Sequence, residues 1–391
     1  MTDAELAALV SELALIDPRS TPGVEALFAF AAKLAAEPEF VDHPIRVVSG
    51  GQTVSAEFVA REVLNIARTP GRTAGEAVAW LRKIPHVTRG VGGAVKAVYG
   101  VKCAERIALS DDVVLIPILE LPPSETRDWI LQEHDRANEA RGLHGFTIAP
   151  WAALYRAGVV EPFFSPHGYD SAKSPQAAWF ADLETAGLLL ALTPRAVPAE
   201  AAHWMHFDDP ELGLLSNFGI TSGVSEFPSH FRMSELTLVT EESARGLLTA
   251  WRGMKSEGDK GRLRLALERL IRSRSQLNPG NRAIDLAIAL EVLFMNVERD
   301  EHSYKISLRV ARLLRKSLAD RRRVLLTVKR VYDLRSGMVH TGKAKDRWNI
   351  DEIELSAYDL VESVDLLCTE AIRKFLNQGG IPEDWRDTEL S

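Results

Sequence analysis

The sequence predicts a mixed fold, in which an α+β N-terminal region precedes an all-α C-terminal helical bundle. Three observations predict it. Apolar residues recur three and four positions apart near both ends of the chain, strand-like runs interrupt this period between Ala97 and Leu121, and only short breaks separate the last five predicted helices. Because 391 residues exceed what one core usually holds, we expect an N-terminal region over 1–255 and a bundle over 262–378.

The N-terminal region divides further into a helical part, 1–95, and a mixed part, 96–255. Helices closed by Pro or Gly are predicted for Asp3 to Leu15, Pro22 to Ala36, Ala56 to Arg68 and Ala74 to Lys83. The mixed part begins with a β-hairpin that turns at Ser110-Asp111-Asp112, followed by a helix from Ser124 to about Ala140. Loops, short strands and one helix, 176–192, are expected over 142–231. A helix from Thr240 to about Met254 then leads into SEGDKG, which is typical of a linker.

Beyond this linker the pattern predicts five helices connected by short segments. They are Arg262 to Gln276, Arg282 to Glu298, Tyr304 to Leu318, Arg321 to Met338 and Asp351 to Leu376. The second is apolar on nearly every face, as expected of a helix that the others surround. Glu291 shares a stripe of this helix with Ile288 and Met295, so we expect a buried carboxylate with a cationic partner, whereas Asp285 lies elsewhere.

Charge is distributed unevenly along the chain. Residues 251–349 contain 24 Lys plus Arg and 11 Asp plus Glu, a balance of 24 − 11 = +13, while the whole chain carries −7. The remaining residues therefore carry −20. Clustered Lys and Arg indicate a contact with nucleic-acid phosphates, although an Arg-rich helical surface that serves only solubility is the alternative.

The sequence also predicts a cytoplasmic protein that does not cross a membrane. Cys103 and Cys368 lie far apart on apolar stretches that are typical of buried thiols, as expected in a reducing compartment. The acidic, amphipathic N-terminus lacks the basic segment and cleavage site of a secretory signal. The longest apolar run, Gly187 to Leu192, is too short for a bilayer.

Three segments of the predicted bundle carry a resemblance to a known family. They read AIDLAIALEVLF from Ala283, KISLRVARLL from Lys305 and VYDLRSGMVH from Val331, and GRLRLALERLI precedes them from Gly261. In this order they resemble the HEPN superfamily, most closely its Apea-like branch, over about 115 to 130 residues. One departure is that Thr341 follows His340, where family members often have Gly.

This resemblance implies a helical bundle that forms a homodimer and cuts RNA without a metal or other cofactor, in antiviral defence or growth arrest. The motif R-x4-H maps onto Arg335 and His340 as the catalytic pair, with Ser336 after the Arg and Glu291 in support. The alternative is a non-catalytic module for dimerisation or for binding RNA or a nucleotide, in which Arg335 only forms an ion pair with Glu291.

The residue types suit RNA cleavage on physical grounds. The 2′-OH is RNA's own nucleophile, so a protein needs only to orient it, move protons with an imidazole and neutralise phosphate charge with a guanidinium. Residues five apart on a helix point about 140° apart, so we expect the helix to loosen near Gly337 and His340 to lie at or past its end. Additional RNA contacts are predicted at Arg321, Arg322, Arg323, Lys329 and Lys343.

Two other patterns predict little. His203 and His206, with Asp208 and Asp209 nearby, suggest a metal site, but the HExxH order and a Cys cluster are both missing. The glycine-rich stretch Gly90 to Gly93 lacks the GK[ST] that a phosphate-binding loop requires. We therefore expect neither a metal centre nor a nucleotide loop.

Overall fold

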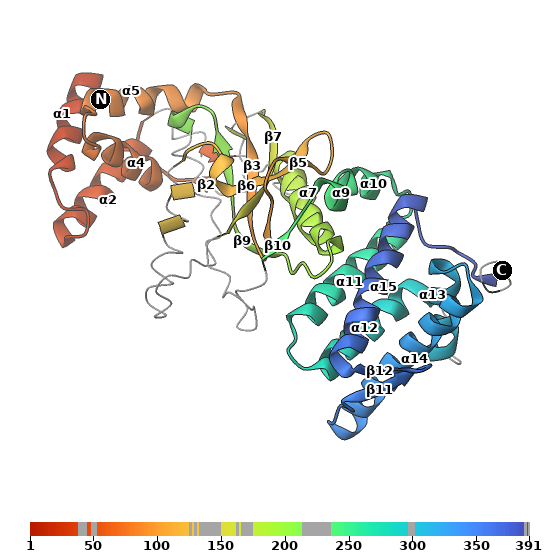
Figure 1. The fold of residues 1–391 in the computed structure, drawn as a ribbon. Coiled ribbons are helices and arrows are strands. Elements are labelled where there is room, and N and C mark those ends of the chain that lie inside the picture. The colour runs from red at the N-terminus through yellow and green to blue at the C-terminus, as the bar shows by residue number, and fades with distance from the viewer. Residues whose placement is uncertain are drawn as a thin grey trace.

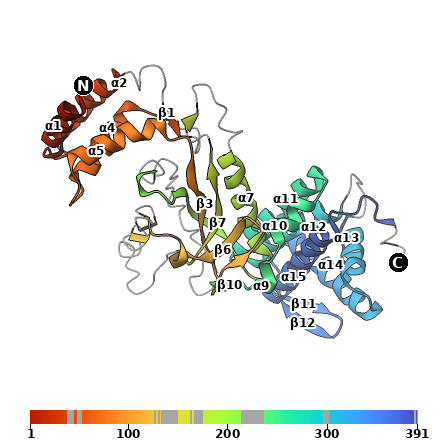
Figure 2. The same cartoon turned by 90° about the horizontal axis from the view of Figure 1, so that it is seen from above.

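The computed structural model describes residues 1–37, 45–47, 53–124, 127–128, 131–132, 150–161, 164–165, 175–212, 236–295, 302–386 and 389. Within them, a group of N-terminal helices, a central antiparallel sheet and a C-terminal helical bundle follow one another along the molecule (Figure 1, Figure 2). The fold is therefore mixed α and β, as predicted. No helix among these residues is long and apolar enough to span a bilayer.

The N-terminal helices agree with the predicted ones to within a residue or two. They are α1 (Asp3–Ala14), α2 (Thr21–Ala35), α4 (Ala56–Arg68) and α5 (Ala74–Lys83). Each begins at a Ser or Thr whose hydroxyl accepts a hydrogen bond from a backbone N–H of the first turn. The 3₁₀ turn η1 (Ile84–His86) leads from α5 towards the sheet.

A five-stranded antiparallel sheet in the order β5-β6-β7-β3-β9 forms the centre of the molecule. Its strands are β3 (Gly90–Tyr99), β5 (Ile107–Ala108), β6 (Val113–Pro117), β7 (Ala152–Val160) and β9 (Ala199–Phe207). The predicted hairpin is present as β5 and β6. The nine-residue strands β7 and β9 contradict the prediction of only short strands. Runs of consecutive buried residues, Ala152 to Leu154 in β7 and Trp204 to Phe207 in β9, replace the alternation of polar and apolar residues by which a strand is recognised.

Short strands and turns complete this region. They are β1 (Ile45–Val47) between β2 (Thr53–Val54) and β8 (Phe164–Ser165), β4 (Val101–Lys102) parallel to β10 (Thr237–Leu238), and the 3₁₀ turn η2 (Ile118–Glu120). Ser124 Oγ accepts a hydrogen bond from the Arg127 N–H, as expected of the predicted cap. Most of the helix predicted after it, and 213–235, lie outside the described residues.

The glycine-rich stretch lies within β3 and is not a loop. A side chain at Gly92 would collide with the His206 carbonyl on β9, and one at Gly93 would collide with the Arg156 carbonyl on β7. The glycines thus allow the neighbouring strands to approach β3 closely. This close packing explains why the stretch is rich in glycine, so nucleotide binding is not needed to explain it.

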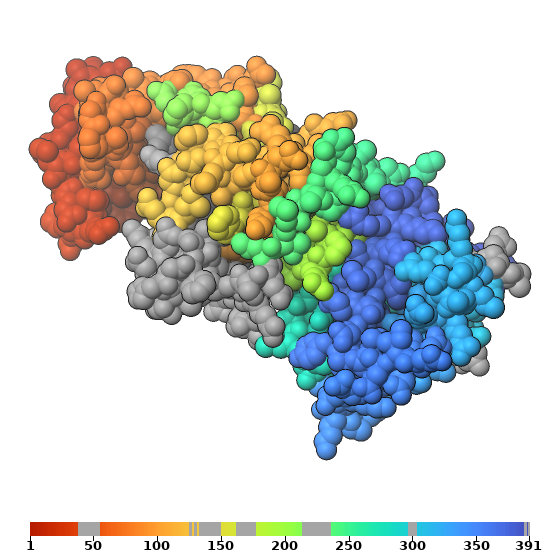
Figure 3. All heavy atoms as spheres, in the orientation of Figure 1, coloured from red at the N-terminus to blue at the C-terminus, as the bar shows by residue number. Residues whose placement is uncertain are grey.

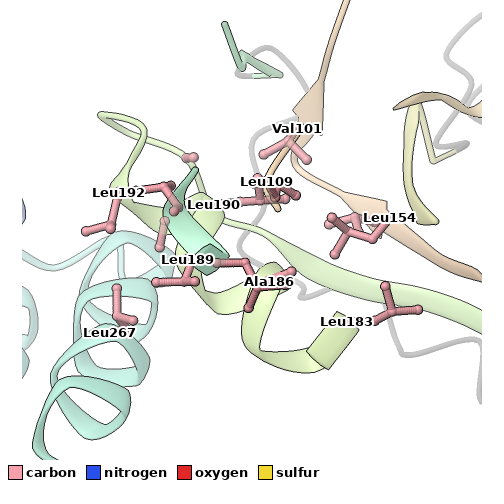
Figure 4. Packing of buried hydrophobic residues seen from close by; sticks show 14 of the residues in the cluster. Val101, Leu109, Leu154, Leu183, Ala186, Leu189, Leu190, Leu192 and Leu267 are labelled. Carbon is pink, nitrogen blue, oxygen red and sulfur yellow. The ribbon is translucent and has the colours of Figure 1, made fainter. Parts of the chain in front are cut away.

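Helix α7 (Pro175–Leu189) and the 3₁₀ turn η4 (Leu190–Leu192) match the helix predicted over 176–192. They pack between the sheet and the bundle (Figure 4). The helix predicted from Thr240 is instead two helices, α9 (Glu241–Ala244) and α10 (Leu247–Gly253). Gly246, with a φ of 69°, separates them, since a left-handed residue ends a helix.

The bundle contains the five predicted helices with shifted ends. They are α11 (Glu257–Ser275), α12 (Pro279–Phe294), α13 (His302–Leu314), α14 (Leu318–Thr341) and α15 (Ala357–Gln378). The predicted linker SEGDKG is helical: Ser256 caps α11, and the other five residues form its first turns. A hairpin of β11 (Arg347–Ile350) and β12 (Ile353–Ser356) precedes α15, where helix was predicted from Asp351.

The bundle and the central region share one hydrophobic core. Leu189, Leu190 and Leu192 lie on the same cluster as Leu267 of α11 (Figure 4). Arg274 on α11 donates hydrogen bonds to the carbonyls of Ala191 and Ala196, at 2.6 and 2.8 Å. Apolar packing and buried hydrogen bonds therefore join the two regions.

Both cysteines are buried, as predicted. Burial raises the pKa of the Cys103 and Cys368 thiols to about 12. A thiol with this pKa is almost entirely protonated near neutral pH, and a protonated thiol is a poor nucleophile. Neither cysteine therefore belongs to a reactive site.

Candidate functional site

Helix α14 carries most of the residues that the sequence singles out. Ser317 caps its beginning by accepting a hydrogen bond from the Asp320 N–H, and Gly342, with a φ of 67°, ends it. The prediction of a helix loosened at Gly337 is wrong, because α14 continues to Thr341. The Thr341 hydroxyl donates to the Gly337 carbonyl at 2.7 Å. His340 lies in the last turn.

Because α14 is unbroken, Arg335 and His340 point in different directions. Five residues of helix separate them by about 140° around the axis. His340 is exposed, whereas the Arg335 side chain is directed towards α12 and is 37% exposed. A single chain therefore does not bring this guanidinium and this imidazole to one point.

Arg335 is held by Glu291 on α12, the partner that the sequence suggested. Its Nη1 lies 3.3 Å from Glu291 Oε1, and its guanidinium lies 6.0 Å from the centroid of the Tyr332 ring. The Nε is buried and has no hydrogen-bond partner among the described residues. Burial raises the pKa of Tyr332, whose hydroxyl donates to the Ala287 carbonyl, so this phenol has a structural role.

The prediction that Glu291 is buried is wrong, since its side chain is 30% exposed. The buried carboxylate of α12 is Asp285, which lies 3.1 Å from Arg269 and 3.6 Å from Arg272, both on α11. The apolar sequence of α12 does not distinguish its two acidic positions. The difference arises from α11, which supplies the two cations that make a buried carboxylate tolerable.

Four other residues share the exposed face of α14. Arg322, Lys329, Ser336 and His340 are spaced by seven, seven and four, which places them within about 40° of one another around the helix axis. All four are exposed. We refer to them as the α14 row. The imidazole of His340 thus lies in line with two cations and a hydroxyl.

The remaining predicted contacts differ in their availability. Arg321 Nε donates to the Arg315 carbonyl at 3.0 Å, which gives Arg321 a local structural role, and Arg322 lies 3.3 Å from Asp351. Arg323, Lys329 and Lys343 are exposed and form no ion pair within the described part of the chain.

The hairpin β11–β12, which was not predicted, runs back along α14. Near the end of the helix a side chain at Gly337 would lie 3.2 Å from the Lys343 carbonyl, and further back Asp351 pairs with Arg322. Gly337 therefore allows a close approach of the hairpin and does not break the helix. The alternation of exposed Arg347 and Asn349 with buried Trp348 and Ile350 was the available signal.

The structure gives no support to a metal centre at His203 and His206. His203 and His206 lie in the regular part of β9, where residues three apart point to opposite faces, whereas a β-bulge separates Glu200 from His203. His203 Nδ1 lies 2.7 Å from Glu200, while burial lowers the pKa of His206. No group of three or more His, Cys, Asp or Glu residues suited to a metal occurs in the described ranges.

Comparisons with protein-family models, with curated proteins and with solved structures gave no match. The chemistry of the site is therefore inferred from its residues. What they offer is an exposed imidazole in line with cations at the end of α14, and a half-exposed guanidinium that Glu291 holds on a neighbouring face.

Proposed function

We propose that the C-terminal bundle is a HEPN-type, metal-independent endoribonuclease that acts as a homodimer, in antiviral defence or growth arrest. The observation that carries the proposal is the exposed position of His340 in the α14 row. An imidazole with an ordinary pKa of about 6.5 can take or give a proton near neutrality. Cations in the same row suit a ligand with a line of phosphates.

The proposed reaction uses the nucleophile of the RNA itself. The 2′-oxygen attacks the adjacent phosphorus, the bond to the 5′-oxygen breaks, and the products are a 2′,3′-cyclic phosphate and a free 5′-hydroxyl. The imidazole takes the proton of the 2′-OH, and a water molecule gives a proton to the leaving 5′-oxygen, after which the imidazolium returns its proton to the hydroxide. Arg335 neutralises charge on the phosphate oxygens, which stabilises the transition state.

This reaction needs two copies of the chain, because Arg335 and His340 diverge within one. Exposed apolar residues at this end of the bundle, Leu277, Val339 and Tyr358, suit a contact between copies. The Tyr358 hydroxyl donates to the Leu277 carbonyl at 2.9 Å, so these two residues are adjacent. In the dimer, His340 of one copy and Arg335 of the other would face the same phosphate.

The test is cleavage of transfer RNA by the full-length protein in EDTA. His340→Ala is expected to reduce the rate at least about a hundredfold, the usual contribution of general acid–base catalysis. His86→Ala, which removes an exposed imidazole from the N-terminal region, is the matched control and should cleave normally. Undiminished cleavage by His340→Ala, or cleavage that EDTA abolishes, would overturn the proposal.

A second candidate is a non-catalytic module that binds RNA. The ion pair between Arg335 and Glu291 favours it, because a guanidinium held by a carboxylate is less available to a phosphate. This candidate predicts that the full-length protein binds RNA without cutting it. Unchanged affinity in both His340→Ala and Arg335→Ala, together with no detectable cleavage, would establish it over the nuclease.

A further inference from the structure

We propose that the α14 row is a binding track for single-stranded RNA, anchored about 27 Å from His340 at the corner between α13 and α14. The proposal rests on the proposed function and adds the form and the minimum length of the substrate. The distance follows from the eighteen residue steps from Arg322 to His340, at about 1.5 Å of rise per residue. The cleavage site and the anchor therefore lie towards opposite ends of one helix.

The α13–α14 corner, which we define as residues 312–323, has the charge that an anchor requires. Six of its twelve residues are Lys or Arg and one is Asp320, a balance of 6 − 1 = +5 along the sequence, although Arg315 and Arg322 form ion pairs with Glu370 and Asp351. The Asp320 carboxylate, in the first turn of α14, accepts a hydrogen bond from the hydroxyl of the capping Ser317. Lys316 and Arg323 are exposed and form no ion pair with any described residue. Their charge is therefore available to a ligand.

The track continues from the corner to His340 without a net opposing charge. Lys329 lies between the two ends and is free of ion pairs among the described residues, and Lys343 lies just beyond His340. Asp333 is the one carboxylate that α14 carries on this face, and Arg330 neutralises it at 3.0 Å. Asp351 of the hairpin is likewise paired with Arg322, so a strand laid along the row would meet free cations, neutral groups and two carboxylates that are each paired with an Arg.

The spacing of these charges favours a polynucleotide over a membrane surface. The two cations of the row, Arg322 and Lys329, are about 10.5 Å apart along a single line, whereas a lipid surface is bound by an amphipathic helix with a broad apolar face. The exposed side chain of Leu318 beside the corner cations also suits a nucleotide, which offers a flat base together with its phosphate.

A single strand suits the proposed chemistry better than a duplex. The 2′-oxygen must be aligned opposite the leaving 5′-oxygen, and a regular double helix restricts that rotation. At about 3.4 Å per nucleotide, a stacked strand of about eight nucleotides spans the distance from Arg322 to His340. Shorter strands can occupy one end of the track but not both.

The experiment measures binding to the full-length protein, using fluorescent 2′-O-methyl oligoadenylates, which stack as single strands and cannot be cleaved. Oligomers of about four, eight and twelve nucleotides should show affinity that rises steeply up to about eight and then levels. Lys329→Gln and Arg323→Gln should each weaken binding of the eight-nucleotide strand by about threefold to fivefold and reduce its salt dependence by about one released ion. Lys33→Gln and Arg89→Gln, at exposed positions of the N-terminal region, are the matched controls.

Several outcomes would overturn the track. These are equal affinity for all three lengths, unchanged affinity in both variants, equal binding of duplex RNA, or binding of anionic phospholipid vesicles in preference to RNA. Failure of the track and failure of the nuclease are distinguishable. Length-dependent binding without cleavage of transfer RNA refutes only the nuclease, whereas cleavage without length-dependent binding refutes only the track.

Discussion

Two ion pairs of the bundle, Arg274–Asp365 and Arg335–Glu291, have the same chemistry in opposite surroundings. The first joins α11 to α15, and its side chains are 4% and 1% exposed. The second joins α14 to α12, and its side chains are 37% and 30% exposed. Breaking a buried ion pair is costly, because each charge would be left unpaired and without water. Solvent screens a half-exposed pair, so each of its groups can exchange its partner for water or a ligand.

The buried guanidinium, Arg274, also makes more hydrogen bonds than the half-exposed one, Arg335. Arg274 donates to Asp365, to the Thr369 hydroxyl and to three backbone carbonyls of 191–196. Within the part of the chain that the structure describes, Arg335 contacts Glu291 and its Nε has no hydrogen-bond partner. A guanidinium whose donors are all used can only support architecture, whereas one with unused donors can bind a ligand.

The largest expected effect on stability is at the buried pair, Arg274–Asp365. Asp365→Ala leaves the buried Arg274 without its carboxylate, which should lower the free energy of unfolding by about 3 to 5 kcal/mol. Urea unfolding of the full-length chain, followed by tryptophan fluorescence, measures it. Glu354→Ala removes the exposed partner of Arg347 and should change stability by less than about 0.5 kcal/mol. Similar losses of unfolding free energy in both variants would show that burial does not make the Arg274–Asp365 pair more important for stability than an exposed pair.

At the half-exposed pair, Arg335–Glu291, we expect a smaller effect on stability and a larger effect on activity. Glu291→Ala should cost at most about 1 kcal/mol of unfolding free energy, because solvent screens a half-exposed pair. Cleavage of transfer RNA should fall about tenfold to a hundredfold, since Arg335 is no longer positioned. A stability loss as large as that of Asp365→Ala, with unchanged cleavage, would assign Arg335 an architectural role.

The smallest effect is a dependence on pH at a third pair of intermediate exposure. The hydrogen bond from His203 holds the pKa of Glu200 at about 2, below its ordinary 4.5, and Lys96 Nζ lies 2.6 Å away. A lowered carboxyl pKa contributes stability above the ordinary value, which is lost as pH falls from about 4.5 to 2. Because Glu200 is partly exposed, we expect at most about 1 kcal/mol.

Urea titrations at several pH values would measure this contribution. Glu200→Gln should remove part of the loss of stability between pH 4.5 and 2, while Glu354→Gln should leave it unchanged. If the two variants had the same pH profile as the unaltered chain, partial burial would not by itself make a carboxylate pair important for stability.

The sequence predicted those elements whose signals are local. The four N-terminal helices combine apolar periodicity with a Ser or Thr cap, and both signals lie within the helix itself. Strands β7 and β9 were missed because their burial depends on what covers the sheet. The helix break at Gly246 was also missed. Glycine can adopt the left-handed conformation found there, but the sequence does not require it to do so.

The candidate site was predictable in its residues and not in its geometry. A partner for Glu291 was predicted because its carboxylate was expected to be buried; the partner is Arg335, although the carboxylate is 30% exposed. The continuity of α14 was not predicted, since a glycine inside a helix is compatible with a break, a kink or a close neighbour. Gly337 allows the Lys343 carbonyl to approach the helix closely, and this contact depends on the hairpin that follows α14.

The continuous core between α7, η4 and α11 limits how the bundle can be moved to another protein. A cassette beginning at Ser256 would strip Arg274 and Arg373 of the carbonyl acceptors that 191–196 provide, and would expose Leu267 to water. Recombination, in evolution or in the laboratory, would therefore preserve the bundle better if residues 175–196 travelled with it. Figure 3 shows how closely these parts adjoin at the molecular surface.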